Sequence, residues 1–135
     1  MVDALHAAHR RVKRGGLVID VRPDARRLPR IIAGGRVRGH IVQSADAEER
    51  DRRSDLAVER VVARGLFRRT GEAGVVWHTS RFADLEELDG YLSDSARYED
   101  YERGTRRALL PFRRGPLTMR RAIRYEILER LATLG

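Results

Sequence analysis

Two histidines near the N-terminus have a spacing that could hold a metal ion. His6 and His9 are three residues apart, so a helix places them on one face, beside Asp3. Imidazole nitrogens are good zinc ligands, but a stable site needs further ligands fixed by the fold. The sequence pattern fixes no third ligand on this face. Ordinary surface histidines are therefore the favoured interpretation, and no metal is predicted.

Five other residues are candidates for a substrate pocket. Asp20, Arg22 and Asp24 lie at and beyond the end of a short apolar segment, where open α/β sheets bind their ligands. Trp77 and His78 are neighbours in a β-branched segment, and neighbours in a strand point to opposite faces. One of these two is expected to pack and the other to face a cleft or water. The sequence contains no P-loop, Gly-x-Ser-x-Gly or His-Glu-x-x-His motif, so no catalytic residue is assigned.

The N-terminal third is predicted to form a helix, a strand and a hairpin. Residues 2–13 have apolar side chains at helical spacing, and the pair Gly15-Gly16 ends the helix. Leu17 to Val21 is apolar on both faces, which predicts a strand covered by helices on both sides. The pair Gly34-Gly35 tolerates the positive φ of a two-residue turn, so the segments on either side of it are expected to form a hairpin.

The remaining elements complete an α/β pattern. The expected helices are residues 45–64, 85–92 and 99–110, and the expected strands are residues 75–82 and 117–128. In the long helix only Leu56, Ala57, Val61 and Val62 offer an apolar stripe. The last strand alternates, with its apolar face formed by Leu117, Met119, Ile123, Tyr125 and Ile127. The chain is predicted to be a single domain, residues 1–135, with a mixed sheet of about three main strands plus a hairpin and flanking helices.

The charge balance invites a nucleic-acid interpretation. The formal net charge is +8, and Lys13 stands alone beside 27 arginines. Clustered arginine would attract phosphate, but these arginines are spread along the chain and interleaved with acids, as in residues 48–53. GC-rich codon usage would give the same excess of arginine over lysine. Solvated helix faces are therefore favoured over a nucleic-acid surface.

The composition also limits the compartment. The chain has no cysteine, which excludes disulfides, thiolate metal sites and cysteine nucleophiles. No apolar run approaches the roughly 20 residues of a membrane span, and the N-terminus has no apolar signal segment. A cytoplasmic location without a membrane partner is expected.

Residues 4–23 resemble a stretch of class I S-adenosylmethionine-dependent methyltransferases. The matching positions are Ala4-Leu5, His9-Arg10, Val12-Lys13, Gly15-Gly16 and Leu17 to Asp20. They are similar to the pattern aL-x-E-x-x-RvLKPGG-lli-d that leads into the fifth strand of that family. Arg14 stands where the family usually has proline, and Arg11 where it has an apolar residue. The later elements also follow a similar order: a long helix, a sixth strand, a helical insertion and a final strand.

The resemblance implies that the chain corresponds to the C-terminal half of a Rossmann-like methyltransferase sheet. The family's Gly-rich cofactor loop and ribose-binding acid belong to its other half. S-adenosylmethionine is thus a cofactor by resemblance only, and this chain alone is expected not to bind it. The implied function is a truncated or split methyltransferase, active only with a complementary N-terminal half. A small basic module for RNA or an acidic partner, and a non-catalytic helper subunit of a methyltransferase, are the alternatives.

The same resemblance predicts where a partner would bind. In that family the fifth strand lies between a parallel fourth strand and the antiparallel seventh, and a fourth strand is not among the elements expected here. The strand Leu17 to Val21 should then have one unpaired edge, which is a template for pairing with another chain. A homodimer or a complex with a complementary methyltransferase half is expected at this edge.

Overall fold

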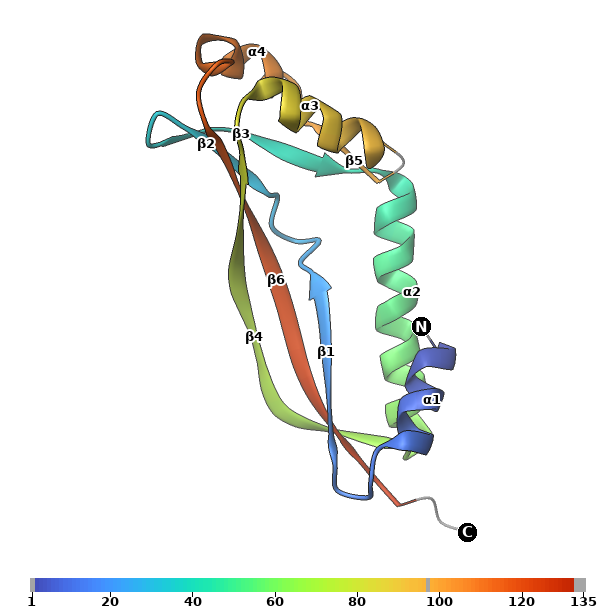
Figure 1. Cartoon of the computed structure of the whole chain (residues 1–135). Coiled ribbons are helices and arrows are strands. Elements are labelled where there is room, and N and C mark those ends of the chain that lie inside the picture. Colours follow the sequence, from blue (N-terminus) through green and yellow to red (C-terminus); the bar gives the residue numbers. More distant parts are fainter. Residues whose placement is uncertain (1, 97, 133–135) are drawn as a thin grey trace. The chain divides into compact units, whose positions relative to one another are not determined.

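The computed structural model describes residues 2–96 and 98–132 and contains, within those residues, six strands and four α-helices (Figure 1). The chain folds into two compact units. The first unit comprises Met1–Arg22, Glu49–Val75 and Arg124–Gly135, and the second comprises Pro23–Glu48 and Val76–Ile123. The long strands β4 (Phe67–Phe82) and β6 (Leu117–Arg130) contribute residues to both units.

Both helices of the first unit cover the same face of its strands. α1 (Val2–Arg11) has Asp3 in its first turn, and Gly15, at φ +76°, then turns the chain into β1 (Leu17–Pro23). α2 (Ala45–Ala63) packs by its C-terminal half. The buried core of this unit consists of Leu5, Ala57, Val58, Val61, Phe67 and Leu128. Because these residues come from α1, α2, β4 and β6, one apolar layer holds the two helices on the strands.

In the first unit β6 lies between β1 and β4 (Figure 1). The Gly15 amide donates to the Arg130 carbonyl at 3.0 Å and the Arg130 amide to the Gly16 carbonyl at 2.9 Å. On the opposite edge of β6, the Leu131 amide donates to the Leu66 carbonyl at 3.0 Å. β1 and β4 each run antiparallel to β6 and are thus parallel to one another. Among the described residues, β1 has a single neighbouring strand and ends the sheet.

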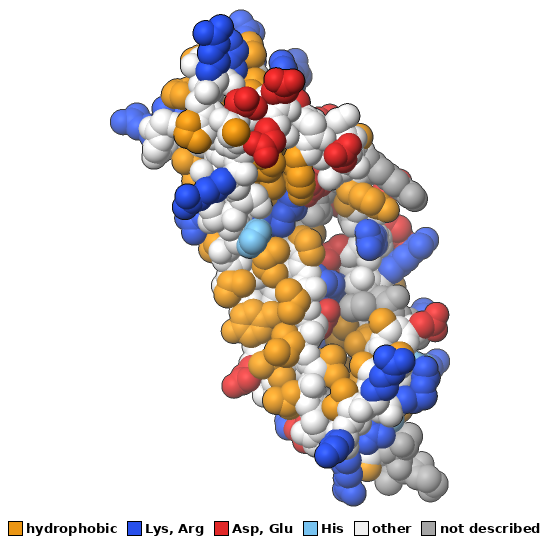
Figure 2. All heavy atoms as spheres, viewed as in Figure 1, with side chains coloured by type: hydrophobic (Ala, Val, Ile, Leu, Met, Phe, Trp, Pro, Cys, Tyr) orange, Lys and Arg blue, Asp and Glu red, His pale blue; other side chains and the backbone are white. Residues whose placement is uncertain are grey.

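β1 is covered on one face only, so the prediction of helices on both sides is wrong. Val18 packs against the core of the first unit, whereas Leu17, Ile19 and Val21 are 58%, 60% and 59% exposed. Alternation along the strand puts these three side chains on the face away from α1 and α2. Hydrophobic side chains gather over β1 and β4 in the view of Figure 2. A strand that the sequence makes apolar on both faces therefore buries only half of its side chains.

The second unit is built on the predicted hairpin, which is confirmed. β2 (Arg30–Ala33) and β3 (Arg36–Gln43) pair antiparallel through Gly34 and Gly35, at φ +58° and +76°. β2 also pairs with β6, and β3 with the short β5 (Glu99–Tyr101). The core beneath these strands consists of Ile31, Ala33, Ile41, Phe82, Leu85, Leu88, Leu92, Leu109, Leu117 and Met119.

The helical insertion is partly as predicted. α3 (Leu85–Asp94) is confirmed with its cap, because the Asp84 carboxylate accepts from the Glu87 amide at 2.9 Å. The single helix expected over residues 99–110 is wrong. Its place is taken by β5, by α4 (Thr105–Leu109) and by a 3₁₀ turn (Leu110–Phe112).

Three other expectations are corrected. β4 begins at Phe67 rather than at Val75, with Gly71 at φ +85° inside the strand. In α2, Val58 is buried while Leu56 is 45% exposed. In β6 the buried side chains are Leu117, Met119, Ala122 and Leu128, so the inward-facing position shifts by one residue after Met119. A strictly alternating strand would have buried Ile123, Tyr125 and Ile127 instead.

The architecture is a mixed α/β fold with a six-stranded antiparallel sheet. The mixed sheet expected from the sequence is wrong, because neighbouring strands of the described residues run antiparallel. The three main strands expected from the sequence are β1, β4 and β6, and the hairpin supplies β2 and β3. β5 is a sixth strand that the sequence pattern did not indicate. Within the described part of the chain, no helix has the length and apolar character required to cross a membrane.

Candidate functional site

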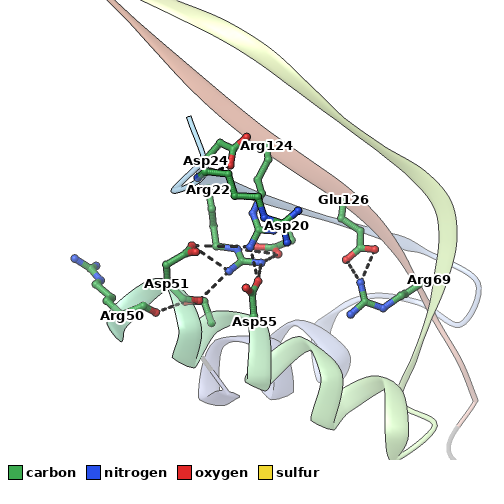
Figure 3. A network of polar contacts seen from close by, with 11 residues as sticks. Asp20, Arg22, Asp24, Arg50, Asp51, Asp55, Arg69, Arg124 and Glu126 are labelled. Atoms are coloured by element: carbon green, nitrogen blue, oxygen red, sulfur yellow. Dashed lines mark hydrogen bonds and ion pairs between the residues drawn. The ribbon is translucent and has the colours of Figure 1, made fainter. Parts of the chain in front are cut away.

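Asp20 and Arg22, two of the predicted pocket residues, meet in a charged cluster of the first unit (Figure 3). Both side chains point from β1 to the face covered by α2. The Arg22 guanidinium donates to the Asp20 carboxylate at 3.2 Å, to Asp55 at 2.7 Å and to Asp51 at 3.5 Å. The Asp20 side chain is 7% exposed and the Arg22 side chain 15%. Arg22 is thus a largely buried cation surrounded by three carboxylates.

Arg124 adds a second cation from β6 to the same cluster. It donates to the Asp55 carboxylate and lies 3.9 Å from that of Asp51. Asp51 and Asp55 are four residues apart on α2, so the helix presents both carboxylates to the strands (Figure 3). The cluster therefore ties α2 to β1 and β6 through charge-assisted hydrogen bonds.

The electrostatics of the cluster argue for a structural role. Burial by itself would raise the pKa of the Asp55 carboxyl. Hydrogen bonds from Arg22 and Arg124, and their positive charges, outweigh that effect and lower this pKa below its ordinary value of 3.8. A carboxylate held ionised in this way is a weak general base, because catalysis near neutral pH needs a pKa closer to 7. Arg22 already donates to three carboxylates, so it has little capacity left for an anionic substrate.

Asp24 belongs to the second unit, where it binds residues of its own turn. Its carboxylate accepts from the Arg26 amide at 3.0 Å and from the Arg27 guanidinium at 2.5 Å, and the residue is only 4% exposed. These bonds hold the turn between β1 and β2. The predicted trio of Asp20, Arg22 and Asp24 is thus divided between the two units.

Trp77 lies beside two arginines on the second unit. The Arg30 guanidinium carbon is 4.5 Å from the centroid of the indole ring, and that of Arg120 is 5.7 Å from it. The β2–β6 register places Arg30 directly opposite Arg120. Trp77 is half-buried and its neighbour His78 is exposed. These distances fit cation–π contacts, which position both guanidinium groups at the ring.

A second polar cluster in this unit is built around Asp89 of α3. Its carboxylate accepts from the Tyr101 hydroxyl at 2.6 Å and from Arg106 at 2.9 Å. The hydrogen bond from Arg106 lowers the pKa of Asp89 against the opposing effect of burial, and burial together with Asp89 raises that of Tyr101. The result is a tyrosine that stays protonated and a carboxylate that stays ionised, which ties α3 to β5 and α4.

The N-terminal histidines do not form a metal-binding group. Among residues 2–96 and 98–132, no three His, Cys, Asp or Glu side chains gather as a metal ion would require. His9 is 7% exposed, its ring meets that of Phe67 edge-on at 5.5 Å, and its Nε2 lies 3.3 Å from the Leu131 carbonyl oxygen. One of the two predicted surface histidines is therefore part of the first unit's interior.

Sequence reasoning did not single out the residues that complete these clusters. Asp51, Asp55 and Arg124 complete the first one, and Arg30 and Arg120 the Trp77 site. The four-residue spacing of the two aspartates was a readable signal for a shared helix face. The arginines gave no local signal, because each meets its partners through strand pairing between distant segments.

Comparison with family models, curated proteins and solved structures found no match to this chain.

Proposed function

We propose that this chain supplies the C-terminal half of a class I methyltransferase-like domain. The supporting observation is the strand order of the first unit. β1, which follows a helix and a Gly-Gly turn, lies beside the last strand of the chain and antiparallel to it. This is the neighbour that the fifth strand has in the family that residues 4–23 resemble. α2 then leads into β4, which matches the order of a long helix and a sixth strand that the resemblance implies.

The partner in this proposal is a complementary N-terminal half that pairs with the free edge of β1. Leu17, Ile19 and Val21 are more than half exposed, and strand pairing at this edge would place them against apolar side chains of the partner. A second copy of this chain fits the edge less well. Arg10, Arg11 and Arg14 lie next to β1 and would repel their counterparts across a two-fold axis.

The cofactor in this proposal is S-adenosylmethionine, held by the complex rather than by these 135 residues alone. None of the glycine pairs lies between a first strand and the N-terminus of a helix, which is where the family places its Gly-rich loop. Gly15-Gly16 precedes β1, and Gly34-Gly35 joins the two strands of the hairpin. In this proposal the chain contributes strands and helices of the domain.

Reconstitution tests the proposal. The DNA upstream of the coding sequence is read for a strand, Gly-rich loop and helix unit, and that segment is produced together with this chain. We expect a one-to-one complex that binds S-adenosylmethionine with a Kd below about 100 μM, or about −5.5 kcal/mol, while this chain alone shows no such binding by calorimetry. Binding of that strength by the isolated chain, or a complement that fails to associate, would refute the proposal.

Two matched variants locate the contact. Ile19→Lys places a charge on the exposed side of β1 and should abolish the complex. Leu56→Lys makes the same change at an exposed leucine of α2, away from this edge, and should leave the complex intact. Light scattering of the chain alone, at about 100 μM, reports whether copies pair in place of the complement; a dimer that Ile19→Lys disrupts would favour a homodimer at the same edge.

A further inference from the structure

The surface around Trp77 contains two arginines that the fold itself does not neutralise. Arg30 and Arg120 are directly opposite one another on adjacent antiparallel strands. Like charges in that position repel, and the pair would be expected to recruit an acidic neighbour. Among the described residues, neither guanidinium has a carboxylate within 4.0 Å, and both lie against the ring of Trp77.

A third arginine extends this surface. Phe82 is buried in the core of the second unit, so strand alternation puts Trp77 and Arg81 together on the opposite face of β4. Ile31 and Met119 face the same core, which puts their neighbours Arg30 and Arg120 on that outer face as well. Arg81 is exposed and has no ion-pair partner among the described residues. The Trp77 surface is defined here as Arg30, Trp77, Arg81 and Arg120.

We propose that the Trp77 surface binds a single-stranded polynucleotide. Guanidinium groups donate two parallel hydrogen bonds to a phosphate, and the indole ring holds two of them in place for that contact. Nucleobases stack on aromatic rings and on guanidinium planes, and both are present side by side here. The surface thus offers phosphate donors and stacking groups within one small area of an antiparallel sheet.

The chemistry of this surface favours a polynucleotide over an acidic protein. Carboxylates of a protein partner would use the three arginines but would leave the half-buried indole without a stacking ligand. A nucleotide uses both kinds of group. RNA and single-stranded DNA share this chemistry, and the contacts described do not depend on a 2′-hydroxyl. The proposal is independent of the methyltransferase assignment, because it uses residues of the second unit and needs neither a complement nor a cofactor.

Trp77 is the only tryptophan of the chain, which makes its fluorescence a direct reporter of the surface. The chain is titrated with oligo(U) and oligo(dT) of about 12 nucleotides, and with polyglutamate of equal charge. Fluorescence anisotropy of labelled oligonucleotides gives the affinity, and Trp77 quenching reports stacking. We expect quenching that saturates together with the anisotropy for one or both oligonucleotides. Equal affinity for the two would indicate phosphate and base contacts alone, and tighter oligo(U) binding would add a contact to the 2′-hydroxyl.

Two double variants that remove the same charge distinguish binding at the Trp77 surface from attraction by the net positive charge of the chain. Arg30→Ala with Arg120→Ala should weaken oligonucleotide binding about tenfold and lower the slope of log K against log salt by about 1.4, at about 0.7 for each lost phosphate contact. The control, Arg107→Ala with Arg114→Ala, removes the same charge from exposed positions elsewhere in the second unit. It should change affinity less than about twofold. Circular dichroism is used to check that both double variants are folded.

Three results would overturn the proposal. Absence of Trp77 quenching at saturating oligonucleotide would remove stacking from the site. Equal losses of affinity in the two double variants would show that net charge alone attracts the oligonucleotide. Tighter binding of polyglutamate than of either oligonucleotide, with the same sensitivity to Arg30→Ala and Arg120→Ala, would assign the surface to an acidic protein. Should a variant fail to fold, Arg81→Ala with the fluorescence readout provides the same test with a single exposed substitution.

Discussion

Two pairs of arginines in this chain have opposite surroundings. Arg22 and Arg124, in the first unit, donate to carboxylates on β1 and α2, and Arg22 is largely buried. Arg30 and Arg120, in the second unit, stand opposite one another beside an indole ring. The side chains are identical, and so is their charge. Whether an arginine stabilises the fold or is left for a ligand depends on which residues the strand register places next to it.

The largest expected effect on stability is that of replacing Arg22, the largely buried arginine of the first unit. Arg22→Ala should lower the free energy of unfolding by about 3 kcal/mol, because it leaves the carboxylate of Asp20 without this cation in a nearly buried position. Urea denaturation measures the change. Arg22→Lys, which keeps the charge but lacks the planar fork, should recover only part of the loss.

Arg30→Ala is the matched control for that experiment. Arg30 is exposed and the substitution relieves a like-charge pair, so the free energy of unfolding should change by less than about 0.5 kcal/mol. Equal losses for Arg22→Ala and Arg30→Ala would contradict the distinction between the two pairs.

A smaller effect should appear in the pH dependence of the free energy of unfolding, through Asp55 of the charged cluster around Arg22. The pKa of Asp55 is lowered in the folded state from 3.8, so below that pH the unfolded chain binds the proton more readily. The stabilisation is present above about pH 4 and is lost as pH falls through the folded-state pKa. Asp55→Asn removes this contribution. The difference in unfolding free energy between the wild type and Asp55→Asn should therefore narrow as the pH falls from about 5 through the folded-state pKa.

The cause of that narrowing can be checked separately. In an Arg22→Ala background one of the two hydrogen bonds that lower the pKa of Asp55 is absent. Asp55→Asn should then produce a weaker pH-dependent difference. A difference that stays constant with pH in the wild-type background would show that the cluster does not lower the pKa of Asp55.

The smallest effect on stability is expected when one arginine of the Trp77 surface is replaced by an acid that can pair with the other. Arg120→Glu puts a carboxylate opposite Arg30 and should raise the free energy of unfolding by about 0.5 kcal/mol through the cross-strand pair. The same substitution should weaken oligonucleotide binding. Thermal denaturation and anisotropy measure the two outcomes. A variant that is both more stable and unable to bind would show that the arginine pair is kept at a cost to stability.

The sequence predicted those elements whose signals are local. α2, α3 with its Asp84 cap, and the hairpin with two positive-φ glycines were all readable from spacing and turn residues. The first half of β4 was missed because charged residues and Gly71 resemble a loop. Its partners lie far along the chain: Arg69 pairs with Glu126 at 2.6 Å across to β6. No window of local sequence contains both halves of that contact.

The candidate sites show the same difference between local signals, which could be read, and contacts between distant segments, which could not. Asp20 and Arg22 could be located at the end of a strand, but their partners on α2 depend on how that helix packs. Trp77 was recognised as a residue that either packs or faces outward, yet its two arginines arrive from β2 and β6. The sequence allowed the type of each residue and its helix or strand to be inferred. The contacts of each side chain could not be inferred, because they depend on the register between strands.

The exposed side of β1 also bears on how this chain behaves during synthesis and purification. Leu17, Ile19 and Val21 form a short β-branched and apolar segment at a sheet edge, which is the kind of segment that nucleates aggregation when chains meet before folding. Arg14 just before the strand and Pro23 at its end act as gatekeepers, since a charge repels an incoming copy and proline cannot donate to a growing ladder. Production without a partner should therefore give more insoluble protein as expression rises, and Ile19→Lys should restore the soluble yield.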